Sequence, residues 1–225
     1  MKAIKGANGI EKLNGYLISK GGGAAEDFAF LIQALSNDET RPMLNLIHIE
    51  QAGGKTICVT TDGSRLHKIE FPIEMADVPA GDYSVRSSVA GIILVPYEEG
   101  GEFPLWRKVI PENQKNHFKI VLAANASKKK ASMSFSTSVF KISQTTGACI
   151  NIKYLEDLIS HNFSDTPWDI HFGDTKTPVV FIQGNRQAVI MPMSVEPVEV
   201  SNGESKPVEK TTNNRQIKKK KEKAA

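Results

Sequence analysis

Several short segments of this chain alternate apolar and polar residues, and this period of two most constrains its fold. The clearest examples are residues 47–50, 132–136 and 168–172. Because successive side chains of a strand point to opposite faces of a sheet, each segment predicts a half-buried strand. Turn residues such as Asp62-Gly63 and Gly184-Asn185 separate the predicted strands, which favours antiparallel pairing.

Two other segments repeat apolar residues with the period of a helix. In residues 26–36 the apolar stripe consists of Phe28, Leu31, Ile32 and Leu35. In residues 152–161 it consists of Tyr154, Leu155, Leu158 and Ile159, and Asn151 precedes it as an N-cap. One helix in each half of a strand-rich chain predicts an α+β fold.

The C-terminal segment differs from the rest in composition. Residues 195–225 carry eight basic and five acidic side chains, so their excess equals the net charge of +3 for the whole chain. Without apolar periodicity the segment cannot offset the entropy of ordering, and we expect a disordered basic tail. The run Lys218–Lys221 favours contact with phosphate backbones, although a purely solubilising tail fits equally well.

Membrane and secretory functions find no support in the sequence. No stretch approaches the roughly 20 apolar residues that a bilayer-spanning helix needs. The start, Met1–Gly6, lacks the apolar run of a signal peptide. We therefore expect a cytoplasmic protein that makes no membrane contact.

The sequence also lacks the signals of an enzyme, a metal site or a bound cofactor. The catalytic and nucleotide-binding motifs HExxH, GxSxG, GxxxxGK[ST] and GxGxxG are absent, and the five histidines show no ligand spacing. Cys58 and Cys149 lack CxxC spacing and read as small buried hydrophobes. We predict no catalytic residue, no metal and no cofactor.

Five segments carry a resemblance to a known family. They are Arg41–Asn45, Thr60–Leu66, Phe103–Pro111, Asn151–Leu158 and Val189–Met193. In this order they resemble signatures of the bacterial sliding clamp, the beta subunit of DNA polymerase III. Thr60–Leu66 alone would also suit an ordinary hairpin, and Met191 and Met193 could simply finish a core strand. The common order of the five segments makes the resemblance specific.

The resemblance implies DNA-clamp domains, which are antiparallel sheets with helices, here abbreviated to one recognisable helix per domain. We expect residues 1–25 to be an N-terminal segment, part of a first domain, followed by clamp-like domains at 26–112 and 113–194 and the tail at 195–225. Such a chain is similar to a shortened, divergent member of the family, as a phage might carry.

The resemblance also implies a groove that binds short peptides of DNA polymerase, the clamp loader and repair proteins. Its apolar residues would form a trough, and Arg65, Asn151 and Tyr154 would bond polar parts of the peptide. The matching positions are Leu44, Thr61, Gly63, Ser64, Arg65, Leu66, Pro111, Asn151, Tyr154, Val180, Val189, Met191, Pro192 and Met193.

Family clamps encircle duplex DNA, and two domains per chain would close a ring as a homotrimer. The two predicted helices expose Glu26, Asp27, Glu156 and Asp157, which makes a poor lining for a polyanion. Scattered basic residues are the DNA-binding candidates, unless they form an ordinary solvated face. They are Arg41, Arg107, Lys108, Lys128, Lys129, Lys130, Lys218, Lys219, Lys220 and Lys221.

Two functions follow as expectations. The first is a sliding-clamp-like processivity factor that tethers DNA polymerase and other replication or repair proteins to DNA. The alternative is a monomeric adaptor that does not encircle DNA and binds or competes for clamp-binding peptides. An enzyme on a degenerate scaffold is a distant third.

Overall fold

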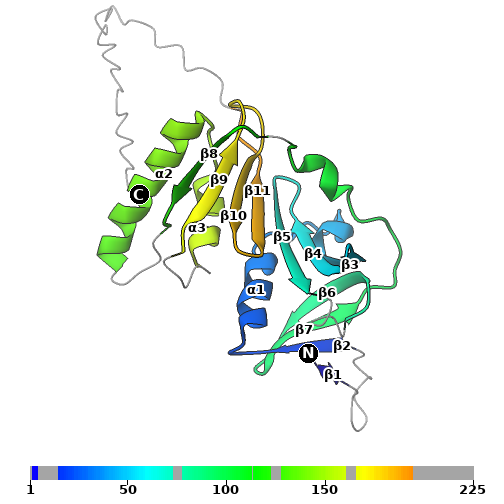
Figure 1. Cartoon of the computed structure of the whole chain (residues 1–225). Coiled ribbons are helices and arrows are strands. Elements are labelled where there is room, and N and C mark those ends of the chain that lie inside the picture. The colour runs from blue at the N-terminus through cyan, green and yellow to red at the C-terminus, as the bar shows by residue number, and fades with distance from the viewer. Residues whose placement is uncertain are drawn as a thin grey trace, which may run out of the picture. The chain divides into compact units, whose positions relative to one another are not determined.

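The computed structural model describes residues 2–4, 15–72, 78–112, 114–122, 128–160 and 166–194 (Figure 1). By its internal contacts, Met1–Ser194 is one compact unit. The expected disordered tail, with Lys218–Lys221, lies outside the described residues. Within the described part, helices long and apolar enough to cross a membrane are absent.

The described strands form one antiparallel sheet in the order β1-β2-β7-β6-β3-β4-β5-β11-β10-β9-β8 (Figure 1). The antiparallel α+β architecture predicted from the alternating segments is confirmed. The strands are β1 Lys2–Ile4, β2 Gly15–Ser19, β3 Ile47–Ala52, β4 Lys55–Thr61, β5 Arg65–Pro72, β6 Gly81–Ser87, β7 Gly91–Pro96, β8 Asn116–Ile120, β9 Trp168–Phe172, β10 Val179–Gln183 and β11 Arg186–Ile190.

Three α-helices accompany the described strands: α1 Gly23–Ile32, α2 Lys128–Thr146 and α3 Ile152–Ser160. Helices α1 and α3 lie where the apolar stripes predicted them, although α1 ends at Ile32 rather than Ser36. The Asn151 side chain accepts a hydrogen bond from the Lys153 N–H at 3.0 Å, which confirms it as the N-cap of α3. Two short 3₁₀ turns are η1 Pro42–Asn45 and η3 Trp106–Val109.

The strand predicted for residues 132–136 is wrong, because this segment lies within α2. Its alternating Ser and apolar residues mimic the period of a strand over a window too short to decide. The longer pattern is helical, since Phe135, Val139 and Ile142 recur at i, i+4 and i+7 and all pack in the main core. The second half therefore has two helices where one was recognisable.

The sheet separates two apolar clusters. The main core lies on the face covered by the helices and contains Ile142 of α2, Leu155 and Leu158 of α3, and Ile170 and Phe181 of the sheet. The smaller cluster lies on the other face and consists of Ile57, Val59, Leu66, Trp106, Val180 and Val189. Neighbouring side chains of a strand point to opposite faces of the sheet. In β10, Val179 and Phe181 therefore pack in the main core and Val180 packs in the smaller cluster.

The two cysteines occupy different environments. Cys58 is 1% exposed in the main core, and burial raises the pKa of its thiol to about 12. Cys149 is half-buried. The sequence prediction of a small buried hydrophobe is therefore confirmed for Cys58, whereas Cys149 is only partly covered.

The pairing of β5 with β11 joins the strands of the first half to those of the second. It places Leu66 opposite Val189 and Arg65 opposite Ile190. A division into clamp-like domains at 26–112 and 113–194 stays a prediction. In such a division, this strand pair would connect the two domains.

Candidate functional site

The turn between β4 and β5 holds a fixed shape through its own side chains. The Asp62 carboxylate accepts hydrogen bonds from the backbone N–H groups of Ser64 at 2.9 Å and Arg65 at 3.0 Å. The Thr61 hydroxyl donates to the Arg65 carbonyl at 2.7 Å. Gly63 has a φ of 92°, a left-handed conformation that disfavours other residues. The Thr-Asp-Gly sequence thus builds a rigid turn.

Side chains of β4 and β5 fix this turn against the end of α1. The last carbonyls of a helix have no partner within it, and the negative end of its dipole attracts cations. Three of these carbonyls accept hydrogen bonds from the sheet. The pairs are His67 Nδ1 with Phe30 at 2.7 Å, Thr60 Oγ1 with Leu31 at 2.7 Å, and Arg65 Nη2 with Gln33.

Arg65 connects three elements and is almost fully buried. Its side chain is 6% exposed and forms ion pairs with Asp62 at 3.1 Å and Asp157 of α3 at 2.5 Å. Its guanidinium carbon lies 4.4 Å from the centre of the Tyr154 ring. These partners use three of the five N–H donors of Arg65 and hold its side chain against the turn. The expected bond from Arg65 to a ligand stays a prediction.

An apolar groove of about 310 Å³ opens beside the turn. Leu66 and Val189, paired across β5 and β11, form its floor. Three of its apolar side chains remain exposed to solvent, namely Leu105 at 69%, Val109 at 44% and Met191 at 40%. The groove is lined by Leu44, Thr61, Gly63, Ser64, Arg65, Leu66, Pro104, Leu105, Trp106, Val109, Val189 and Met191.

The segment 103–109 forms one wall of the groove, and its side chains contact strand β3. The Phe103 ring stacks on His48 with centroids 4.7 Å apart. Arg107 forms two hydrogen bonds to Glu50, at 2.5 and 3.1 Å, and covers the Trp106 ring at 4.2 Å. These contacts hold the segment in place although it has almost no regular secondary structure.

Eight of the fourteen predicted positions line this groove, and six do not. Asn151 and Tyr154 line a separate polar cavity of about 600 Å³ near the start of α3, and Asn151 is occupied as the helix cap. Val180 lies beside the groove floor, opposite Val189 on the neighbouring strand β10. The remaining three, Pro111, Pro192 and Met193, line neither of these two cavities.

Four lining residues were not predicted from the sequence, namely Pro104, Leu105, Trp106 and Val109. The matched segment Phe103–Pro111 contained them, but only Pro111 was taken as a groove residue. The available signal was the density of apolar residues between two prolines, in a segment with neither helical nor strand periodicity.

The candidate DNA-binding residues of the described part come from separate segments of the chain. Arg41 pairs with Asp38 at 2.8 Å, and the hydrogen bonds from Thr40 and Arg41 lower the pKa of Asp38 to about 2. Arg107 is occupied by Glu50, and Lys108 is exposed. Lys128, Lys129 and Lys130 form the first turn of α2.

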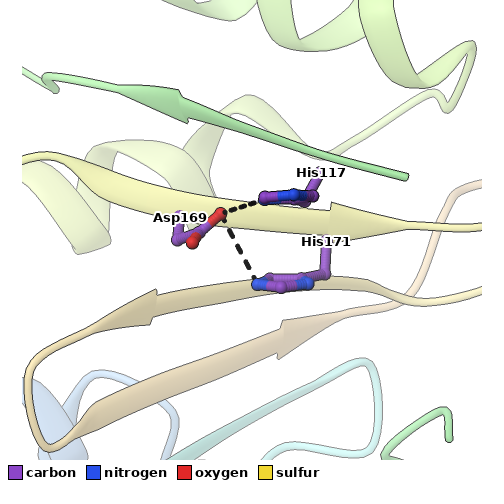
Figure 2. Close-up of side chains that lie close together, drawn as sticks. All are labelled: His117, Asp169 and His171. Atoms are coloured by element: carbon purple, nitrogen blue, oxygen red, sulfur yellow. Dashed lines mark hydrogen bonds and ion pairs between the residues drawn. The ribbon is translucent and has the colours of Figure 1, made fainter. Parts of the chain in front are cut away.

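Two histidines without ligand spacing in the sequence come together with a carboxylate in the fold. His117 of β8 lies opposite His171 of β9, and Asp169 sits two residues earlier on β9 (Figure 2). The ligand atoms of these three residues all lie within 4.8 Å of one another, and the absence of a metal site stays a prediction.

No protein-family model matches this chain. A curated relative, the beta sliding clamp of Treponema pallidum, is 30% identical over 114 residues, which covers 38% of this chain and 30% of that protein. The chain thus spans less than a third of the length of that relative.

Solved structures of bacterial clamps share the fold. The beta subunit of Thermotoga maritima DNA polymerase III aligns with a TM-score of 0.55 and 15% identity, covering 87% of this chain and 68% of the other. The beta chain from Streptococcus pneumoniae aligns with a TM-score of 0.57 and 13% identity, covering 84% and 67%. The chain therefore shares the fold of these bacterial sliding clamps.

Proposed function

We propose that this chain acts as a sliding-clamp-like processivity factor that holds DNA polymerase and other replication or repair proteins at DNA through the apolar groove. The observation that carries this proposal is the pairing of Leu66 with Val189 at the groove floor. These residues belong to two separate segments that resemble clamp signatures, and the fold brings them into one ligand-sized concavity. The role is one of binding and needs no chemical step.

The groove suits a short peptide with one or two apolar anchor side chains. Its volume of about 310 Å³ lies at the small end of ligand pockets, which span about 300–1,000 Å³. Met191 offers a flexible, polarizable wall that can adapt to related side chains. A binding site shared by several partners benefits from such a wall, which fits the polymerase, clamp loader and repair proteins as partners.

Two clamps with this fold were solved with a ligand. The Bartonella birtlesii clamp was solved bound to griselimycin, and the Pseudomonas aeruginosa clamp with a ligand. These findings support a ligand-binding role for the groove of this chain. The partners proposed here are short linear peptides of a DNA polymerase and its clamp loader, in the cytoplasm.

The direct test measures fluorescence polarisation of a labelled peptide that covers the clamp-binding segment of a bacterial replicative DNA polymerase. Met191→Ala should weaken binding about tenfold, because Met191 lines the groove and is already 40% exposed, so the fold should tolerate the change. Met193→Ala is the matched control, since Met193 is 46% exposed and does not line the groove. Equal affinity of the wild type and Met191→Ala would reject the groove.

Helix α2 supplies the electrostatic argument for DNA. The helix contains four lysines, at positions 128, 129, 130 and 141, and no acidic residue. Helices α1 and α3 alone looked a poor lining for a polyanion, but the sequence pattern had not revealed α2. We propose that α2 faces duplex DNA in a homotrimeric ring, with contacts to phosphates that carry no sequence preference.

The DNA proposal is tested by replacing Lys128, Lys129 and Lys130 with glutamine. Each lysine–phosphate ion pair that the substitutions remove should make the plot of log affinity against log salt concentration less steep by about 0.9. The affinity for duplex DNA, measured from low to moderate salt concentration, gives this slope directly. Light scattering coupled to size exclusion reports whether the full chain is a trimer.

A monomeric adaptor is the second candidate, and the acidic residues on the exposed faces of α1 and α3 favour it. Glu26 and Glu156 would repel phosphates if those helices faced DNA. The adaptor predicts a monomer that still binds the polymerase peptide, whereas the clamp predicts a trimer that binds both peptide and duplex.

A further inference from the structure

The edge of the sheet brings two imidazoles and a carboxylate onto one face. In the pairing of β8 with β9, His117 lies opposite His171, and Lys119 lies opposite Asp169. Residues two apart on a strand share a face, so Asp169 and His171 point the same way, as Figure 2 shows. The cluster is nonlocal in sequence, which is why spacing alone did not reveal it.

Asp169 already lies at the separation of a metal ligand from each of the two imidazoles. Asp169 Oδ1 lies 3.2 Å from His117 Nδ1 and 3.5 Å from His171 Nε2, and all three ligand atoms lie within 4.8 Å of one another. Tetrahedral Zn²⁺ with bonds of about 2.0–2.2 Å holds its ligand atoms about 3.3 Å apart. Only the distance between the two imidazoles needs to shorten.

The cluster is accessible and can adjust. The side chains are 57% exposed at His117, 30% at His171 and 28% at Asp169, so a hydrated ion can reach them directly. The two rings stack with centroids 5.3 Å apart and planes 15° from parallel. The exposed His117 ring needs only to rotate about its side-chain bonds to direct its nitrogen toward a shared ion.

We propose that His117, Asp169 and His171 bind one divalent cation of the Zn²⁺ class. Imidazole nitrogens with one carboxylate suit Zn²⁺, Cu²⁺ or Ni²⁺ better than Mg²⁺ or Ca²⁺, which prefer oxygen ligands. Three protein ligands leave a fourth tetrahedral position for water. Lys119 lies opposite Asp169 in the strand register, and its positive charge should lower the affinity for a cation.

The ion would fasten an edge strand. Among the described strands, β8 is the last of the sheet and pairs only with β9. One ligand comes from β8 and two come from β9, so a bound ion cross-links the two strands. The site also shares a face with the groove, because His171, Val180, Val189 and Leu66 form one row across four strands.

Zn²⁺ titration of the full chain by calorimetry tests the proposal. Wild-type protein should show one saturable site, and His117→Gln, His171→Gln and Asp169→Asn should each weaken it about tenfold or more. His48→Gln is the matched control, because His48 also contacts a carboxylate, Asp82 at 2.7 Å, but has no second imidazole in its ion pairs. Its affinity for Zn²⁺ should stay within about twofold of wild type.

Hydrogen exchange supplies a second readout that does not depend on calorimetry. Zn²⁺ should slow amide exchange of β8 in wild-type protein and in His48→Gln, but not in His117→Gln. Wild-type affinity in both His117→Gln and His171→Gln, or unchanged β8 exchange at saturating Zn²⁺, would overturn the proposal. Met191→Ala should keep zinc binding, so failure of the groove proposal is distinguishable from failure of this one.

Discussion

The two faces of the sheet around β5, β11 and β10 are built alike but covered differently. On the helix side, α1, α2 and α3 enclose residues such as Ile170 and Phe181, both 0% exposed. On the groove side, the segment 103–109 covers the sheet only in part and leaves Leu105 at 69% exposure. Complete cover gives stability, whereas incomplete cover over an apolar floor leaves a place for another molecule to bind.

Apolar surface therefore serves different purposes on the two faces. Apolar surface removed from water within the chain contributes about 25 cal/mol per Å² to folding. The apolar surface still exposed in the groove is available to contribute to binding instead. Substitutions on the helix side should therefore change stability, and substitutions at the groove rim should change affinity.

The largest effect should follow from Phe181→Ala on the helix side. Truncation of a fully buried Phe leaves a cavity and should lower the free energy of unfolding by about 3–5 kcal/mol. Phe140→Ala removes the same atoms from a side chain of α2 that is 60% exposed, and should stay within about 0.5 kcal/mol of wild type. Urea unfolding measures both; similar losses would mean that the two positions are equally buried.

Arg65→Ala should have the next largest effect, because it removes the link between the groove turn and the helices. The substitution removes the cation that pairs with Asp62 and Asp157 and the donor that bonds the Gln33 carbonyl. A fully buried broken pair costs about 3–5 kcal/mol, and the partly exposed carboxylates here reduce that to about 2–3 kcal/mol. Arg65→Lys should recover little, since lysine cannot reproduce the forked contacts. Full recovery in urea unfolding would show that charge alone matters.

The elements that the sequence predicted are those whose signal is local. Helix α3 follows from four apolar residues on one face and an N-cap, and β9 from strict alternation over Trp168–Phe172. Helix α2 was missed because its central residues 132–136 alternate like a strand, and only the i, i+4 and i+7 contacts of Phe135, Val139 and Ile142 identify it. A short window could not separate the two periods.

The candidate site was only partly predictable for the same reason. Motif resemblance supplied Leu66, Val189 and Met191, but the role of Arg65 depends on α3 approaching the turn, which no local pattern encodes. The contribution of Leu105 depends on where an irregular segment lies. The pairing of His117 with His171 depends on strand register, which spacing along the sequence does not show.

Leu105→Asp should separate affinity from stability on the groove side. Leu105 lines the groove and is 69% exposed, so the substitution should change the free energy of unfolding by less than about 0.5 kcal/mol. Peptide affinity should fall about tenfold, equivalent to about 1.4 kcal/mol, because an apolar anchor would meet a charge. Unfolding and fluorescence polarisation on the same preparation measure both. A stability loss as large as that of Phe181→Ala would erase the distinction between the two faces.

The smallest effect concerns polar side chains outside the groove, where ion pairs replace packing. Glu70 of β5 accepts hydrogen bonds from Lys55 at 2.7 Å and Lys68 at 2.9 Å, and these bonds lower its pKa below the ordinary 4.5. A lowered folded-state pKa means that the carboxylate stabilises the fold above about pH 4.5, and that this contribution disappears as the pH falls through the lowered value. Because Lys55 is 57% exposed, solvent screening limits the contribution to about 1 kcal/mol or less.

Glu70→Gln should therefore be slightly less stable than wild type at pH 7 and equally stable in strong acid, as measured by urea unfolding across pH. A difference that persists at low pH would show that Glu70 acts through packing, and the groove face would then resemble the helix face more than its exposure indicates.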